Sequence, residues 1–368
     1  MRPVVGLIET LSTHEDLGHS QAKLAKEKLL LAGLVLAAVL VAPVSLQAET
    51  AATLDIYWID VEGGAATLIV TPERESVLMD TGWPRTDERD AERIQAAMSD
   101  AGISVIDYLL ISHFHRDHVG GLAALSDRVS IGQIIDHGDS VEQGREAADA
   151  LWRDYLAVAG TRRRSVTPGE KLALEGIELQ FVASHRRLID PVAALPENER
   201  CESATSPRDD PGENGHSLGY LLSLGDFQFL NLGDLTPDRE HALACPANRL
   251  GVVDLFQVPH HGGYGAIRSE LLGALQPTAV VINNGPRKGG TPESLEVVQT
   301  TPGAGDVWQS HRVLAGNGAF NTEESLIANL NEEDDCAGHW IKATVESDGS
   351  SWTMTNGRTG DTRSYRSK

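Results

Sequence analysis

The sequence predicts an α/β fold built from two βα-rich halves. Short apolar runs typical of buried strands alternate with stretches of helical spacing. Histidines and aspartates gather directly after several of these runs, where α/β folds place their sites. The chain has 368 residues, 41% of them apolar, which is enough for one domain of about 250 residues with appendages.

Apolar runs and helical spacing predict the elements of the two halves in order. The run from Leu218 to Leu232 is expected to form a hairpin that turns at Gly225 and Asp226. The stretch "SVEQGREAADALWRDYLAVAG" has helical spacing and a glycine stop, and helices are also expected after Asp87 and near Ser294. The other strands are expected at residues 54–59, 66–70, 108–111, 177–182 and 279–282.

The stretch "LLISHFHRDHVGGL" holds the highest density of metal-ligand residues. His113 and His115 are two apart, so in extended backbone both rings point to one side and can share an ion. Asp117 and His118 follow at once, and a turn of the chain would aim them at a neighbouring point. A lone histidine is more often solvated, but imidazole and carboxylate at this spacing suit zinc. The motif therefore predicts two adjacent metal positions.

Three further motifs place acidic or histidine residues after strands. Asp80 follows a β-type run in "SVLMDTGWP", and Asp234 ends the expected hairpin in "GDFQFLNLGDL". His260 and His261 end a strand in "VVDLFQVPHHGG". Together with the histidine motif, these residues predict one site made from several strand ends.

These motifs resemble those of a known superfamily. "SHFHRDHVGG" resembles the signature of the metallo-β-lactamase superfamily, which implies an αββα sandwich with a dinuclear metal site at one edge. "DIYWIDVEGGAATLIV", "FLNLGD" and "VPHHGG" look like the hydrolase domain of the DNA-uptake competence channel and its free-standing relatives, among them phosphorylcholine esterases. The likeness covers about Asp55 to Val313, and "WTMTNGRTGDTRSY" looks like the closing hairpin of stand-alone members.

One segment departs from that branch. The branch usually reads D-V-G-Q-G-D-A, whereas this chain reads "DVEGGAA" from Asp60 to Ala66, so the second acidic group of this loop is lost. The role of that group in the relatives is therefore not expected to carry over to this chain.

The resemblance implies a role for each candidate site residue. Asp80 would orient the metal loop, and Asp117 and His260 are expected to take part in catalysis. His216 could instead only cap a strand, because the competence branch often has Asn and Ser here, represented by Asn214 and Ser217. His260 and His261 could exchange roles if the strand ended one residue differently. The implied ligands are His113, His115 and His216 for the first metal, Asp117, His118 and His261 for the second, and Asp234 for both.

The expected function is a hydrolase that uses two divalent ions. Zn²⁺ is the expected metal and Mn²⁺ the alternative, with a metal-activated hydroxide as nucleophile. A phosphoester is the expected substrate. Hydrolysis of lactone, thioester or β-lactam carbonyls on the same site is the alternative, and a non-catalytic metal-binding module is the third hypothesis.

The net charge of the chain indicates which class of substrate it can bind. The chain carries −22, and the segment before Glu49 holds equal numbers of acidic and basic residues, so the rest keeps the whole imbalance. Such a surface repels polyphosphate backbones, which favours a small phosphoester over nucleic acid. The exception is the basic cluster Arg162 to Arg164.

The N-terminal segment is typical of a secretory signal. Lys26 and Lys28 precede an apolar run that extends from Leu29 to Ala42, and Pro43 follows. We expect cleavage near Ala48 and export to the periplasm or the outside; retention as an anchor, with a membrane as partner, is the alternative. The expected organisation is an extension over 1–48, a hydrolase domain over 53–315 and a C-terminal extension over 316–368.

The chain has three cysteines, too few for a disulfide framework. Cys201 and Cys245 are the expected disulfide pair in an oxidising compartment, which would leave Cys336 as a free thiol. None stands in one of the metal motifs, so the expected ligands are nitrogen and oxygen only.

Overall fold

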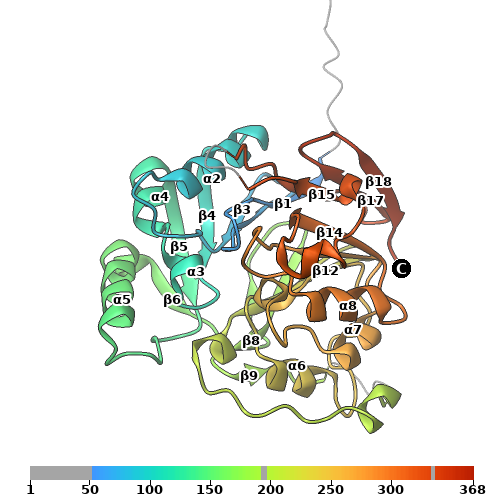
Figure 1. Cartoon of the computed structure of the whole chain (residues 1–368). Coiled ribbons are helices and arrows are strands. Elements are labelled where there is room, and N and C mark those ends of the chain that lie inside the picture. The colour runs from blue at the N-terminus through green and yellow to red at the C-terminus, as the bar shows by residue number, and fades with distance from the viewer. Residues whose placement is uncertain (1–51, 192–196, 333–335) are drawn as a thin grey trace, which may run out of the picture. The chain divides into compact units, whose positions relative to one another are not determined.

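The computed structural model describes residues 52–191, 197–332 and 336–368, which form two β-sheets with helices on their outer faces (Figure 1). The N-terminal segment expected to act as a signal lies outside the described residues. In spatial order, the strands of the first sheet are β18 (Thr362–Arg366), β17 (Ser351–Asn356), β16 (Ile341–Val345), β1 (Leu54–Trp58), β2 (Thr67–Val70), β3 (Ser76–Met79), β4 (Val105–Leu110), β5 (Ser130–Asp136) and β6 (Arg163–Ser165).

The second sheet holds the later half of the chain. The spatial order of its strands is β15 (Ile327–Asn329), β14 (Asp306–His311), β13 (Ala279–Ile282), β12 (Leu255–Gln257), β11 (Phe227–Asn231), β10 (Gly219–Leu224), β8 (Glu178–Ser184) and β7 (Lys171–Leu172), with β9 (Arg187–Leu188) paired to β8. The expected hairpin is confirmed as β10 and β11, and the closing hairpin as β17 and β18. Strands β16 to β18 extend the first sheet through the pairing of β16 with β1.

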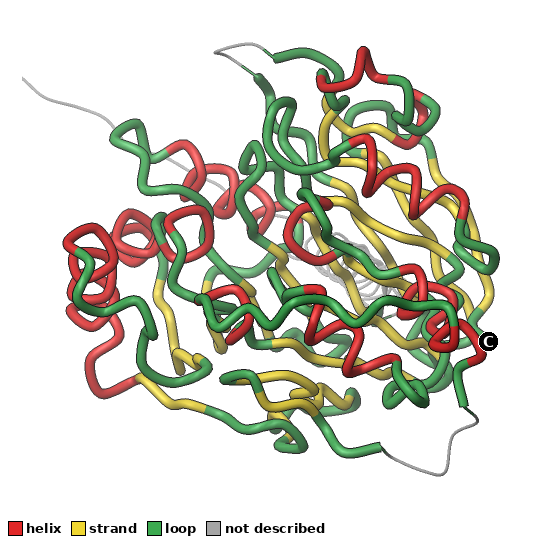
Figure 2. The backbone as a smooth tube through the Cα atoms, turned by 60° about the horizontal axis from the view of Figure 1, so that its bottom comes forward, coloured by secondary structure: helices red, strands yellow, loops and turns green. Residues whose placement is uncertain are grey.

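Helices cover the outer face of each sheet, so the order of layers is αββα (Figures 1 and 2). The helices of the first half are α2 (Arg89–Asp100), α3 (Arg116–Val119), α4 (Leu122–Arg128) and α5 (Glu146–Ala159). Those of the second half are α6 (Pro237–Ala244), α7 (Ser269–Leu275) and α8 (Pro292–Thr300). The predicted α/β sandwich is therefore confirmed. Within the described residues, no helix is both long and apolar enough to cross a membrane.

Strand β1 shows why the layers form. Leu54, Ile56 and Trp58 point into the core between the two sheets, whereas Tyr57 packs in the core beneath the helices of the first half. This alternation follows from the two-residue period of a strand, and both faces are apolar because both are covered. Trp58 meets Phe229 of β11 edge to face, with ring centroids 5.4 Å apart, which joins the two sheets.

Strand direction brings the motifs together. Strands β3, β4 and β5 run parallel, and so do β11 to β14, so the carboxyl ends within each set share one edge. The predicted disulfide is also present: Cys201 is bonded to Cys245, and Cys336 is a free thiol. The shared edge of the parallel strands is the feature that positions the residues of the candidate site.

Candidate metal centre

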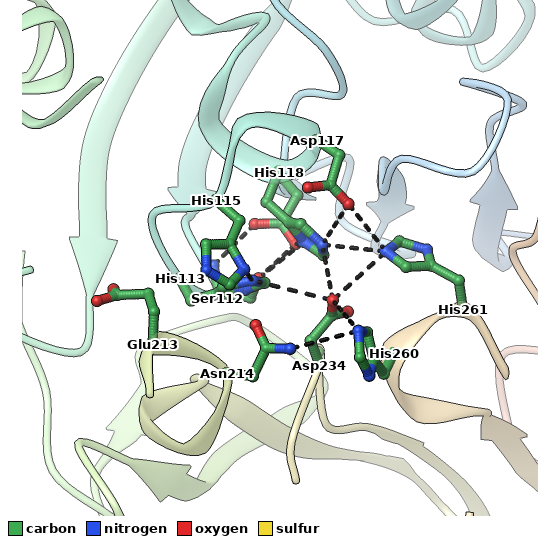
Figure 3. Close-up of polar contacts among 12 residues, drawn as sticks. Ser112, His113, His115, Asp117, His118, Glu213, Asn214, Asp234, His260 and His261 are labelled. Atoms are coloured by element: carbon green, nitrogen blue, oxygen red, sulfur yellow. Dashed lines mark hydrogen bonds and ion pairs between the residues drawn. The ribbon is translucent and has the colours of Figure 1, made fainter. Parts of the chain in front are cut away.

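The predicted ligands other than His216 come from three strand ends that meet at one point (Figure 3). The loop after β4 carries His113 and His115, and the short helix α3 carries Asp117 and His118. Asp234 follows β11. His260 and His261 lie after β12 in the 3-10 turn η4 (Pro259–Gly262), both with positive φ, which turns the two rings in different directions. The convergence is the one expected from the carboxyl ends of the strands.

Two glycines let the metal loop pack tightly. A Cβ on Gly121 would lie 2.0 Å from the Thr81 carbonyl oxygen, and one on Gly120 would lie 2.2 Å from Pro84 Cδ. The Gly121 amide donates to the Gly82 carbonyl at 3.1 Å. The backbone after α3 therefore rests directly on the loop after β3, and no larger residue fits there.

Four buried side chains form a group suited to one cation: Asp117, His118, Asp234 and His261. His118 Nε2 lies 3.1 Å from His261 Nε2 and 3.2 Å from Asp234 Oδ2. Asp117 Oδ2 lies 3.3 Å from His118 Nε2 and 3.2 Å from His261 Nε2. A tetrahedral site with bonds of about 2.0–2.1 Å has edges of roughly 3.3 Å. The residues therefore fit a zinc-sized ion.

A second set of donors lies beside this group. His113 Nε2 is 3.0 Å from His115 Nδ1, so the two rings meet as their spacing predicts. His113 Nε2 is also 3.9 Å from Asp234 Oδ2. His115 is half-exposed, and its Nε2 lies 3.7 Å from Glu142 Oε2. Asp234 thus faces both sets with one oxygen.

Hydrogen bonds orient the buried imidazoles. His118 Nδ1 donates to Asp80 Oδ2 at 2.8 Å, and His261 Nδ1 lies 3.2 Å from the Asn283 carbonyl oxygen. Ser112 donates its hydroxyl to Asp80 Oδ2 at 2.6 Å and can accept from His113 Nδ1 at 3.0 Å. Holding each Nδ1 leaves Nε2 free to face the cluster, as in metal-binding histidines. Asp80 has the orienting geometry that the resemblance implied.

Charges in the cluster are tightly balanced. Burial would raise the pKa of Asp234, but His118 and His261 hold it well below its usual range. Burial opposes a charge on His118, yet the carboxylates of Asp234, Asp117 and Asp80 raise its pKa well above the usual value. Without a cation, a proton on His118 thus compensates the carboxylates. A divalent ion would take the place of that proton, because ligation requires a neutral imidazole.

His216 is the one predicted ligand that the structure does not bring to the cluster. It lies in the 3-10 turn η3 (Glu213–His216), and its Nδ1 is 2.9 Å from the Gly212 carbonyl oxygen. Its ring packs against His185 and His137, with centroid distances of 4.9 and 5.9 Å. In a 3-10 turn, residues three apart lie on the same side, so His216 lies on the side of Glu213 and not on that of Asn214.

Asn214 is the residue of the same turn that reaches the site. Its Nδ2 donates to His260 Nε2 at 3.3 Å, and Figure 3 shows it between His115 and His260. Its buried Oδ1 has no hydrogen-bond partner within the described ranges. Glu213 points the other way and accepts from the Phe114 amide at 3.2 Å, which ties η3 to the metal loop.

Lys288 was not predicted as a site residue. Its ammonium pairs with Asp117 Oδ2, donates to the Gly63 carbonyl at 2.6 Å and lies 5.0 Å from the centre of the Trp83 ring. Nothing local marks it in the sequence, because its partners lie in the loops after β1, β3 and β4. The only signal is a basic residue between strand β13 and the glycines before α8.

Comparison with known families agrees with this geometry. Residues 59–191 match the family model described as "Metallo-beta-lactamase superfamily". This match covers residues 59–191, and the αββα layers and the donor set agree with it: this part of the chain is similar to the metallo-β-lactamase superfamily, and its donor set could hold a metal ion.

Among characterised proteins, the chain is similar to Recombination protein 2 of Haemophilus influenzae. The two are 25% identical over 235 residues, which is 63% of this chain and 24% of that protein. The chain thus aligns with about a quarter of the length of this relative. The match agrees with the predicted likeness to competence-type hydrolase domains.

Two solved structures are among those to which the chain is similar. The metallo-beta-lactamase fold protein YhfI from Bacillus subtilis is 12% identical, with a TM-score of 0.43 over 79% of this chain and 99% of that one. The diiron β-hydroxylase CmlA from Streptomyces venezuelae is 16% identical, with a TM-score of 0.38 over 62% and 44%.

Proposed function

We propose that this chain hydrolyses phosphoester bonds in small, singly charged substrates and uses two Zn²⁺ ions, with Mn²⁺ as the alternative metal. The observation that carries the proposal is the position of Asp234 Oδ2. This oxygen lies 3.2 Å from His118 Nε2, 3.5 Å from His261 Nε2 and 3.9 Å from His113 Nε2. One carboxylate oxygen that faces two ligand sets suits a pair of closely spaced cations, the arrangement common in phosphoesterases.

The ligand sets follow from the contacts. We assign Asp117, His118 and His261 to one ion and His113 and His115 to the other, with Asp234 shared. The unpaired Oδ1 of Asn214 replaces His216 as the candidate that completes the second set. When bound, the two ions would supply positive charge for the phosphoryl oxygens and activate a water molecule.

His260 is suited to proton transfer rather than ligation. Its side chain is 39% exposed, whereas that of His261 is 1% exposed. Its Nε2 lies 3.9 Å from Asp234 Oδ2, close to the cluster but on its solvent side. From this position it can exchange a proton between the leaving group and solvent. This geometry supports His261 as the ligand of the pair.

Lys288 supports an anionic substrate. Its side chain is 37% exposed beside the buried Asp117, so its charge lies at the rim of the cluster. One ammonium group can pair with one phosphoryl oxygen, which fits a small ester better than a long polyanion.

A substrate panel tests the proposal. The purified chain is assayed with bis(p-nitrophenyl) phosphate, p-nitrophenyl phosphate, a lactone and nitrocefin, each with added Zn²⁺ or Mn²⁺. Asp234→Ala serves as the blank, and Asp226→Asn, in the exposed turn at the other end of the same hairpin, serves as the matched control. We expect a phosphoester to have the highest kcat/KM. A higher value for the lactone or nitrocefin would assign the site to carbonyl substrates.

We also propose export of the mature chain. The support is the apolar run that ends at Pro43, together with a disulfide between Cys201 and Cys245. N-terminal sequencing of the chain from fractionated cells should find a start near Glu49 outside the cytoplasm. A soluble cytoplasmic chain that begins at Met1 would refute export.

A further inference from the structure

A second cluster of ligand-type side chains lies outside the dinuclear site, where the C-terminal segment meets both sheets. Asp60 follows β1, His311 ends β14, and Cys336 precedes β16. One donor atom from each residue lies within 4.8 Å of the other two. Asp60 and His311 are each 1% exposed, and Cys336 is partly buried. Side chains from three distant parts of the chain thus converge on one point.

His311 points to a ligand in this cluster. Its Nε2 lies 2.8 Å from Asp60 Oδ1, but the contact lacks the geometry of a hydrogen bond. Neither ring nitrogen has a hydrogen-bond partner in the part of the chain that the structure describes. A fully buried imidazole rarely lacks partners at both nitrogens. Two metal-ligating atoms that lie this close without forming a hydrogen bond are expected where both of them face one cation.

The charged side chains around Asp60 are compatible with a bound cation. Arg93 Nη1 donates to Asp60 Oδ2 at 3.0 Å, and Asp60 Oδ1, which accepts from the Glu62 amide at 2.9 Å, faces His311. Arg93 also lies 3.5 Å from Glu62 Oε1, and Arg89 pairs with Glu62 Oε2 at 2.7 Å. Arg89 also pairs with Asp90 Oδ1 at 2.7 Å, so three carboxylates face two arginines. A divalent ion that binds with loss of the thiol proton adds one positive charge, which compensates this excess negative charge.

The backbone holds Cys336 at the cluster. Arg93 Nη2 donates to the Cys336 carbonyl at 2.5 Å, and Asn329 Oδ1 accepts from the His339 amide at 2.9 Å. The thiol makes a weak polar contact with Asn329 Oδ1 at 3.8 Å. Its sulfur is therefore available to a metal.

We propose that Asp60, His311 and Cys336 bind one ion of the Zn²⁺ class, separate from the dinuclear centre, with water completing the coordination. One sulfur, one nitrogen and one oxygen donor favour zinc or cobalt over calcium or magnesium. The thiol proton passes to solvent on binding. The ion fastens the segment after residue 335 to the ends of β1 and β14, and so joins the C-terminal strands to both sheets.

Cobalt titration tests this site without interference from the dinuclear centre. Only a thiolate gives an intense sulfur-to-Co²⁺ charge-transfer band in the near ultraviolet. The dinuclear donors are nitrogen and oxygen, and Cys201 and Cys245 form a disulfide under non-reducing conditions. We expect the wild-type chain to develop the band and to saturate it by about three equivalents of Co²⁺ per chain, because the dinuclear centre takes up two. Asp234→Ala should retain the band, and Cys336→Ser should lose it.

Further variants separate ligation from folding. His311→Gln removes a ligand but keeps the thiol, so it should also lose or strongly shift the band. Circular dichroism checks that each variant is folded, and elemental analysis should find about one Zn²⁺ fewer in Cys336→Ser than in the wild type. A folded wild-type chain without the band, or a band that persists in Cys336→Ser, would overturn the proposal.

Discussion

At the scale of single residues, the candidate centre depends on atoms that approach closely because they share a ligand. Asp234 is almost fully buried beside His118 and His261, and its charge is held by them. Removing one member of such a group leaves the others as buried, uncompensated charges or unpaired donors. Single substitutions here should therefore change metal content as well as turnover.

Asp234→Asn keeps the shape of the side chain but removes the charge shared by the two ligand sets. We expect metal content to fall by at least one ion per chain, and kcat/KM for the phosphodiester to fall by more than about 100-fold. Elemental analysis and steady-state kinetics measure both. Asp226→Asn should match the wild type, and an Asp234→Asn chain with undiminished metal content and full activity would exclude the bridging role.

His260 and His261 should respond differently to alanine. His261 Nε2 lies 3.2 Å from Asp117 Oδ2, so His261→Ala should lose one ion. His260→Ala should keep both ions and lose about 10²- to 10⁴-fold in kcat through the missing proton transfer. Parallel metal analysis and kinetics distinguish the two. The reverse pattern would make His260 the ligand.

Most of the candidate centre could be predicted from the sequence, because consecutive motifs after strands must meet at one edge. The exception is η3. Whether His216 or Asn214 faces Asp234 depends on how a short turn is rotated. No local sequence pattern predicts that rotation. Lys288 could not be predicted either, because it is 171 residues from Asp117 in sequence.

At the scale of elements, the metal loop is held by backbone contact between α3, α4 and the loop after β3. Gly121 has φ −79°, which any residue can adopt, so only the closeness of Thr81 requires glycine. Strands with continuous apolar runs, such as β2 and β13, were predicted, whereas the alternating strand β16, "IKATV", was not. Strand β14, "DVWQSH", was not, because its buried polar residues Gln309, Ser310 and His311 hide the apolar pattern.

Gly121→Ala should displace α3 and with it Asp117 and His118. The added Cβ would lie 2.0 Å from the Thr81 carbonyl oxygen, an overlap that costs about 1–3 kcal/mol or more of unfolding free energy. Urea unfolding and metal analysis should show lower stability and weaker binding. Ala123→Ser, at an exposed position on α4, is the control, and equal stability of the two variants would refute the steric argument.

Glu240 in α6 should make stability depend on pH. Its carboxylate oxygens accept from the Ile267 and Arg268 amides before α7, at 3.2 and 2.9 Å, and burial raises the pKa of Glu240 to about 8. A raised carboxyl pKa means that the folded chain binds the proton more tightly than the unfolded chain. This contribution is fully present below about pH 4 and is lost as the pH rises toward 8.

Urea unfolding at several pH values measures this effect. Glu240→Gln removes the titrating group and should make the unfolding free energy less dependent on pH between about 5 and 8. The slopes, rather than the absolute stabilities, are compared, because the amide also changes the hydrogen bonds to α7. A Glu240→Gln chain with the wild-type slope would assign the dependence to other groups.

At the scale of the whole molecule, the net charge of −22 surrounds a centre that would hold at most four metal charges. The basic cluster at residues 162–164 is largely neutralised in the structure. Arg163 pairs with Asp136 at 2.5 Å, and Arg164 pairs with Glu170 at 3.0 Å. These pairs leave little free positive charge for a nucleic-acid backbone, which agrees with the proposal of a small substrate.

Salt dependence tests that argument directly. Repulsion between an anionic surface and a polyanion weakens as salt screens it, over roughly 10 Å at 0.1 M. Turnover of single-stranded DNA, if any, should therefore rise with added salt, while turnover of bis(p-nitrophenyl) phosphate changes little because a monoanion meets mainly the local field. A protein that binds DNA through basic contacts shows the opposite, a steep fall in affinity with salt.

Both substrates are measured at constant metal concentration, with Asp234→Ala as blank and Arg164→Gln as a probe of the basic cluster. Efficient DNA cleavage that falls with salt, and falls further in Arg164→Gln, would show that a local basic track outweighs the net charge and that nucleic acid is the substrate.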